Sequence, residues 1–119
     1  MYSPVVMDHF EHPRNAGKPP RSNCVGRHGD PSAGPFTVVY MDVQNGIIEG
    51  VGFQTYGCGP AIAAASILTE IIKGKTLAEA GQIQGIEILG IMGDLPLGKH
   101  HCIDTAIQAL ADGLRKGVE

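Results

Sequence analysis

Apolar residues recur at helical spacing in two segments of the chain. The first begins at Pro60, a residue that suits a first helical position, and ends before Gly74. The second begins near Lys99 or His100. Residues three or four apart share one helical face. These apolar positions are Ala64, Ile67, Leu68, Ile71 and Ile72 in the first segment, and Ile103, Ile107, Leu110 and Leu114 in the second. We therefore predict two amphipathic helices.

Residues 36–43 and 47–56 have a different pattern, because they are rich in β-branched and aromatic side chains typical of strands. Asn45 and Gly46 separate them. This dipeptide favours a two-residue hairpin turn, since both central positions of that turn need positive φ. The pattern predicts an antiparallel hairpin whose second strand leads directly to Cys58.

Two shorter helices are indicated by their starts. Ser3 is a good N-cap and Pro4 a good first residue for a helix over residues 3–11. This helix is expected to direct three apolar side chains to a core, namely Val5, Val6 and Phe10. The segment Thr76–Glu79 has the pattern of a capping box and predicts another short helix that runs towards Gln82.

Two glycine-rich and proline-rich segments give weaker signals. Residues 15–35 predict a long loop, with a short extended piece around Cys24 and Val25. Residues 85–98 are interrupted by four glycines and Pro96, so we expect at most one helical turn there, around residues 86–91.

Length and charge narrow the classes of function. At 119 residues, the chain is most simply one domain, residues 1–119. A net charge of -3 with scattered Lys and Arg residues argues against a nucleic-acid partner. The most apolar run, residues 61–72, is too short to cross a bilayer, and no signal segment opens the chain. We expect a cytoplasmic protein without a membrane partner.

The three cysteines are Cys24, Cys58 and Cys102, and an odd number cannot all pair internally. Cys58 precedes Pro60, so it should lie at a helix N-terminus, where free N–H groups and the helix dipole stabilise a thiolate. A small buried cysteine in a strand-to-helix turn is the simpler alternative. Cys102 also lies at a predicted helix start, beside His101. Two thiolates and an imidazole would suit a metal, although the spacing alone does not bring them together.

Several segments, taken in order, resemble a known family. They are DHFEHPRN (8–15), GIIE (46–49), QTYGCGPAIAAAS (54–66), KGK (73–75) and LPLGKHHC (95–102). Together they are similar to the NifU/IscU-like iron-sulfur cluster assembly scaffolds. The resemblance implies a compact α+β domain in which a three-stranded antiparallel sheet packs against several helices. It also implies a non-enzymatic protein that holds a labile [2Fe-2S] cluster, iron or zinc, receives sulfur from a cysteine desulfurase and serves recipient apo-proteins.

Motif by motif, the resemblance assigns Cys58 as the family's middle cysteine, Cys102 as its last, and His101 and Lys99 as the adjacent histidine and lysine. Thiolates suit iron and zinc, and a histidine can complete the shell. Lys99 would stabilise thiolate or persulfide charge, or would be an ordinary solvated lysine.

The family's first cysteine lies in a C-G-D motif, and the chain departs from this pattern. An ungapped count places Ser32 at the cysteine position and Gly34 at the aspartate position. Asp30 is our first choice for a replacement metal ligand, with a turn-forming role before Pro31 as the alternative. Other candidates are Cys24, His28 and a second protomer in a homo-oligomer.

The leading hypothesis is therefore a scaffold that assembles a cluster at Cys58, His101 and Cys102 and passes it on. One alternative is a zinc-dependent sulfur acceptor for a cysteine desulfurase, and another is an interaction domain with a structural zinc site. A thiol enzyme that uses Cys58 with His101 as its base is disfavoured, because no orienting third residue or oxyanion hole is evident.

Overall fold

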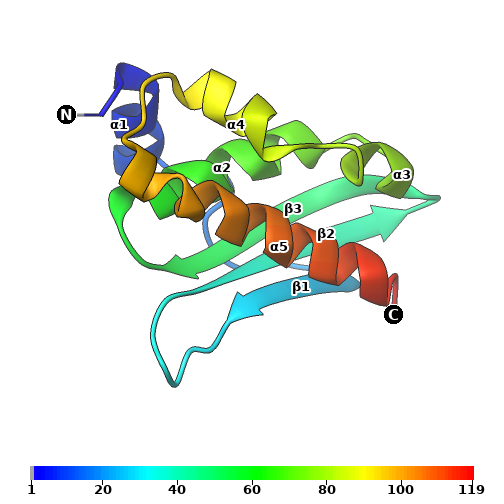
Figure 1. The fold of residues 1–119 in the computed structure, drawn as a ribbon. Coiled ribbons are helices and arrows are strands. Elements are labelled where there is room, and N and C mark those ends of the chain that lie inside the picture. Colours follow the sequence, from blue (N-terminus) through cyan, green and yellow to red (C-terminus); the bar gives the residue numbers. More distant parts are fainter. Residues whose placement is uncertain (1) are drawn as a thin grey trace.

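The computed structural model describes residues 2–119 and shows a three-stranded antiparallel sheet with helices packed across one face (Figure 1). The strands lie in the order β1-β2-β3, with bounds Cys24–Gly29, Phe36–Gln44 and Ile47–Tyr56. The helices are α1 (Pro4–Glu11), α2 (Gly59–Ile72), α3 (Leu77–Ala80), α4 (Gly85–Met92) and α5 (His101–Lys116), and a short 3-10 helix, η1 (Leu97–Lys99), precedes α5. The expected α+β fold is confirmed.

The predicted hairpin is formed by β2 and β3. Asn45 and Gly46 have φ values of 55° and 78°, so both turn positions have the positive φ that the sequence indicates. The register pairs Phe36 with Tyr56 at the far end of the hairpin. The chain therefore leaves β3 beside the start of β2 and enters the Gly57-Cys58 turn there.

Strand β1 corrects the prediction of a long loop over residues 15–35. Six residues, Cys24–Gly29, pair antiparallel with β2. The glycines of this segment lower its strand propensity, so the sequence pattern did not predict a strand of this length. Gly26 is required because of its packing against α5. A Cβ atom at Gly26 would lie 1.9 Å from the carbonyl oxygen of Ala109 in α5. The strand and the helix therefore meet backbone to backbone.

The two long helices cover the sheet side by side, α5 over β1 and β2 and α2 over β3 (Figure 1). Between them and the sheet lies the core, which includes Val39, Met41, Ile48, Leu68, Ile72, Ile103 and Leu110. Helix α2 also contacts α1 and α4, so more than its predicted face is buried: Ala63, Ala65, Ser66 and Thr69 are inaccessible as well. Within residues 2–119, no helix combines the length and apolar character that crossing a bilayer requires.

Helix α1 begins as predicted, with the Ser3 hydroxyl accepting a hydrogen bond from the Val6 N–H at 3.2 Å. The predicted core contribution is only partly right. Val6 is fully buried, whereas Val5 and Phe10 keep 38% and 42% of their surface exposed. Only one face of this short helix lies on α2, and Phe10 rests at its rim, close to Gly59.

A buried polar network fastens α1 to α2. The His9 Nδ1 atom lies 2.7 Å from the Ser66 hydroxyl, which also accepts a hydrogen bond from the Arg14 N–H at 2.9 Å. On its other side, His9 faces the Glu70 carboxylate at 3.5 Å. Because Ser66 is fully buried, these bonds satisfy groups that water does not reach.

The prediction of at most one helical turn in residues 85–98 is wrong, because α4 has eight residues. The Gln84 and Glu87 side chains form a capping box at its start, and Gly93, with φ of 77°, ends it. Ile88 and Met92 are fully buried. Burial against neighbouring helices thus outweighs the low helix propensity of the glycines. The short helix predicted at Thr76–Glu79 is present, and its capping box is complete.

The outer edges of both edge strands are partly covered. On β3, the Phe53 N–H donates to the Asn15 carbonyl at 3.1 Å, and the Gly17 N–H donates to the Phe53 carbonyl at 2.7 Å. On β1, the Arg27 N–H donates to the Asp112 carboxylate of α5 at 2.9 Å. The segment before β1 and the last helix therefore both add hydrogen bonds to the sheet.

Candidate functional site

A cavity of about 250 Å³ lies at the end of the sheet where β3 finishes and β2 begins. The turn after β3 supplies Cys58, and the start of α5 supplies His101 and Cys102. The cavity is lined by Pro35, Phe36, Thr37, Thr55, Tyr56, Gly57, Cys58, Ala61, Lys99, His101, Cys102 and Thr105. Segments that are far apart in the sequence therefore meet at one end of the molecule.

The two thiols of this cavity are neighbours. The Sγ atoms of Cys58 and Cys102 are 3.4 Å apart. Cys58 is the N-cap residue of α2 and is half-buried, whereas Cys102 lies in the first turn of α5 with 3% of its surface exposed. The hairpin delivers one sulfur, and the packing of α5 beside α2 delivers the other.

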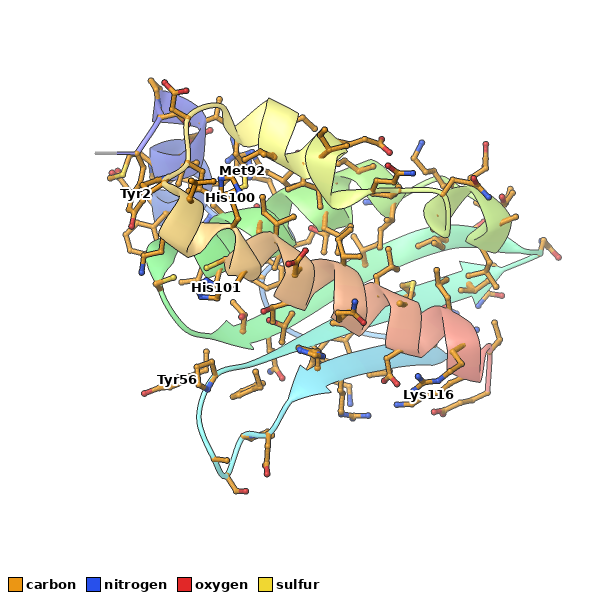
Figure 2. The ribbon with its side chains drawn as sticks, in the orientation of Figure 1. Tyr2, Tyr56, Met92, His100, His101 and Lys116 are labelled. Carbon is orange, nitrogen blue, oxygen red and sulfur yellow. The ribbon has the colours of Figure 1, made fainter. Side chains whose placement is uncertain are left out.

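The cavity also contains an imidazole, that of His101. Its Nε2 atom lies 3.7 Å from the Cys102 Sγ atom, and its side chain is exposed. The neighbouring His100 is engaged elsewhere, because its Nε2 atom lies 2.9 Å from the Leu95 carbonyl oxygen. Figure 2 shows His100 directed toward α4 and His101 toward the end where Tyr56 lies. His101 is thus the histidine available to the thiols.

Burial dominates the electrostatics of the inner thiol. It raises the pKa of Cys102 to about 12, and the adjacent Cys58 thiol contributes in the same direction. Lys99 acts in the opposite sense but more weakly. Burial therefore favours the neutral thiol of Cys102 over its thiolate. The thiolate-stabilising effect expected at a helix start is smaller than the cost of desolvation.

Asp30 lies outside the residues that line the cavity. Its exposed carboxylate accepts hydrogen bonds from the Ser32 N–H at 2.9 Å and the Ser32 hydroxyl at 2.7 Å. These bonds hold the pKa of Asp30 below its usual value. The carboxylate thus shapes its own turn after β1, as the alternative interpretation from sequence has it. Ser32, which the ungapped count from sequence places at the family's first cysteine position, is exposed in the same turn.

Cys24 and His28 also lie apart from the two thiols. Cys24 is completely buried between β1 and α5, where its Sγ atom lies 3.3 Å from the Gly113 carbonyl oxygen. Burial raises the pKa of this thiol. His28 borders a small hollow with Pro31 and Phe36. In the described part of the chain, no three His, Cys, Asp or Glu side chains are arranged to hold a metal ion.

Comparison with known proteins identifies the family. The model of the NifU-like N terminal domain matches residues 1–117. The chain belongs to this family. It is 42% identical over 118 residues to the iron-sulfur cluster assembly scaffold protein IscU 1 of Archaeoglobus fulgidus, covering 99% of this chain and 74% of that one. It is also 42% identical to the IscU scaffold protein of Haemophilus influenzae, over 92% of this chain and 89% of the relative.

Solved structures agree on the fold of this NifU-like domain. A crystal structure from Fervidobacterium islandicum, described as a candidate iron-sulfur cluster assembly scaffold protein for the SUF system, superposes with a TM-score of 0.76. The two sequences are 21% identical, and the match covers 95% of this chain and 96% of the other. At this identity, the likeness shows the fold alone.

Sequence reasoning missed the aromatic wall of the NifU-like domain's cavity. Phe36 and Tyr56 stack with ring centroids 6.3 Å apart, and Thr37 and Thr55 share a hydrogen bond of 2.8 Å between their hydroxyls. The hairpin register contained the signal. The two-residue turn at Asn45 and Gly46 places Phe36 near the end of β3, and a bulge between Asp42 and Val43 then shifts the pairing by one residue, so that Phe36 lies opposite Tyr56 rather than Thr55.

Proposed function

We propose that this chain is an iron-sulfur cluster assembly scaffold that holds iron or a [2Fe-2S] cluster at Cys58, His101 and Cys102 and passes it to recipient apo-proteins. The observation that carries the proposal is the 3.4 Å separation of two thiols in a cavity that also contains an imidazole. Sulfur and nitrogen ligands of this kind suit iron. The scaffold names of the relatives support the same role.

The unequal exposure of the ligands fits a cargo that enters and leaves. Cys58 is half-buried and His101 is exposed, so incoming iron can meet them first. To bind a cation as a thiolate, Cys102 must give up its proton. Assembly therefore releases protons, and iron is held more weakly as the pH falls.

A second protomer supplies the ligands that one chain lacks. A [2Fe-2S] cluster takes four cysteine thiolates, and one protomer offers Cys58 and Cys102 at the cavity. The Asp30 carboxylate is occupied by two bonds to Ser32, so its recruitment requires this turn to open. Two copies facing each other through their cavities provide four thiolates without that change.

Sulfur comes from a cysteine desulfurase in this proposal, and Cys58 is the accessible acceptor. Zinc is the second candidate cargo, because two thiolates and an imidazole are common zinc ligands. With zinc bound, the chain would act as a zinc-dependent sulfur acceptor. Either chemistry needs free thiols and belongs in the cytoplasm, where cysteines stay reduced.

Anaerobic reconstitution with ferrous iron and sulfide tests the scaffold proposal. We expect the full-length protein to acquire visible absorption and to elute from gel filtration at the mass of a dimer. Cys58→Ala should stay colourless, whereas Cys24→Ala, which alters a thiol outside the cavity, should colour normally. A colourless wild-type protein contradicts the proposal. Stoichiometric zinc without iron in the freshly purified protein would favour the zinc alternative.

A further inference from the structure

The closeness of the two cavity thiols supports metal binding and is also suited to a second reaction. Their sulfurs are 3.4 Å apart, close to van der Waals contact, with no residue between them. One thiol is accessible and the other is 3% exposed. An accessible thiol backed directly by a buried one is the arrangement in which the first accepts a group and the second displaces it.

We propose that Cys58 and Cys102 form a resolving pair that converts a persulfide into free sulfide. This inference rests on the proposed sulfur-accepting role of the site and adds a reaction to it. Cys58, the more exposed of the two, receives the persulfide, and the buried Cys102 thiol releases the outer sulfur. The step happens once per loaded chain and leaves the pair oxidised.

The reaction balances without a further oxidant. A sulfane-sulfur donor R-S-SH transfers its outer sulfur to Cys58-SH, so the donor S–S bond breaks, Cys58 becomes Cys58-S-SH and the donor leaves as the thiol R-SH. Cys102 gives its proton to His101, and the resulting thiolate attacks the Cys58 Sγ atom, so the bond between Cys58 and the outer sulfur breaks as the Cys58–Cys102 disulfide forms. The outer sulfur leaves with the electron pair and two protons as H₂S, one proton coming from the persulfide and one from Cys102. An external dithiol reductant restores both thiols.

The geometry selects attack on the inner sulfur of the persulfide. Cys102 Sγ lies 3.4 Å from the Cys58 Sγ atom itself, which would be the inner sulfur of the persulfide. Attack on the outer sulfur would only move the persulfide to Cys102. The His101 Nε2 atom, 3.7 Å from the Cys102 sulfur, is placed to carry the Cys102 proton to the departing sulfide.

Two further features favour attack of Cys102 on a Cys58 persulfide in this chain. Ser32 replaces a third sulfur at the position where the resemblance expects one, and a serine hydroxyl neither accepts sulfane sulfur nor forms a disulfide. Cys24 is sealed beneath α5 and bonded to the Gly113 carbonyl. A persulfide on Cys58 therefore has Cys102 as its thiol neighbour in the cavity.

The test treats the reduced, metal-free, full-length protein with stoichiometric glutathione persulfide under anaerobic conditions. Free thiols are then trapped, and the peptides that contain Cys58 and Cys102 are analysed by mass spectrometry. We expect a Cys58–Cys102 disulfide and one released sulfide per chain in the wild type and in Cys24→Ala. Cys102→Ser should instead retain a Cys58 peptide heavier by one sulfur atom and should lose the sulfide release. Thermal unfolding confirms that each variant is folded.

Each result decides the inference. A stable persulfide on wild-type Cys58, or its transfer intact to Cys102, overturns it. A disulfide that also forms without the persulfide donor overturns it as well, because oxidation would then have another source. Iron and sulfide reconstitution of a separate, fully reduced portion of the protein, not treated with the persulfide donor, separates the two proposals, because the disulfide would consume both ligand thiols. Colour in that portion with no disulfide in the donor experiment retains the scaffold and loses the resolving pair, whereas no colour in that portion with the disulfide in the donor experiment does the reverse.

Discussion

The two ends of α5 are built in opposite ways. At its C-terminal end, Gly26 of β1 and Gly113 of α5 approach so closely that a Cβ on Gly113 would lie 3.0 Å from the Gly26 nitrogen. At its N-terminal end, His101 is exposed and Cys102 faces a cavity shared with Cys58. One end is sealed backbone to backbone, and the other is left accessible to ligands.

This difference separates stability from chemistry along one helix. The glycine contact fixes the position of α5 on the sheet. It therefore also fixes the position of Cys102 at the cavity. At the thiol end, His101 is exposed and Cys58 is half-buried, so these two side chains can reach a ligand. Rigidity at one end and access at the other are what a carrier of labile cargo requires.

The largest expected effect comes from breaking the sealed end. In Gly26→Ala, the new methyl would lie 1.9 Å from the Ala109 carbonyl oxygen, which is backbone and cannot rotate away. We expect a loss of about 3 kcal/mol or more in the free energy of unfolding, measured by urea denaturation. A loss below about 1 kcal/mol would show that α5 shifts easily on the sheet.

A second comparison uses pH and sets the α1–α2 contact against the sealed end of α5, because His9 and Asp112 titrate in different pH ranges. Burial, followed by the charge of Arg14, lowers the pKa of His9 from 6.5, although Glu70 and Asp8 oppose the shift. The unfolded state then binds more protons than the folded state near pH 6, so stability is lost as the pH falls below about 6.5. Asp112 at the sealed end has a lowered pKa, chiefly through its bond to Lys116, and loses its contribution only below about pH 4.

Urea midpoints at about pH 7.5 and pH 5.5 measure the His9 effect. We expect the wild type to be less stable at the lower pH and His9→Gln to show a smaller decrease. Nuclear magnetic resonance titration of the His9 ring provides an independent measurement that does not require the variant to fold. An apparent pKa above 6.5 for this ring would contradict the assignment.

The smallest expected effect is at Gly90, a glycine of α4 that belongs to neither end of α5. Gly90 is helical in α4, and a Cβ there meets no atom within 4 Å. Gly90→Ala should raise the free energy of unfolding by about 0.5–1 kcal/mol, because alanine has the higher helix propensity. Comparing the thermal unfolding of Gly90→Ala with that of Gly26→Ala tests whether the loss of stability at Gly26 comes from its contact with α5. A decrease in stability at both positions would point to a general intolerance of the added methyl.

The sequence predicted the elements whose local signals agree with their packing. The hairpin around Asn45 and Gly46, the helix after Pro60 and the capping box at Thr76 all follow from nearby residues. Strand β1 and helix α4 were missed or shortened because their formation depends on contacts with distant segments, such as Gly26 against Ala109. A glycine required by a tertiary contact cannot be distinguished in the sequence from a glycine that ends a helix or strand.

The candidate site was predictable in kind but not in arrangement. Helix-start positions marked Cys58 and Cys102 as chemically interesting, and the family resemblance joined them, whereas residue spacing alone did not. Asp30 was predicted as a metal ligand because it lies in the same loop as the expected first cysteine. Its actual position depends on the hydrogen bonds that it makes within its own turn. Competition between a local hydrogen bond and a distant ligand role depends on loop geometry that sequence patterns do not encode.

The covered edges of the sheet also limit how copies of this protein can meet. Because Asn15 and Gly17 pair with Phe53 on β3, and Asp112 caps Arg27 on β1, neither edge offers a continuous row of free backbone groups to an incoming strand. Growth of the sheet from chain to chain, the route to fibrous aggregates, is thereby hindered. A concentrated solution should therefore favour association through side chains, and the thiol end presents reactive ones.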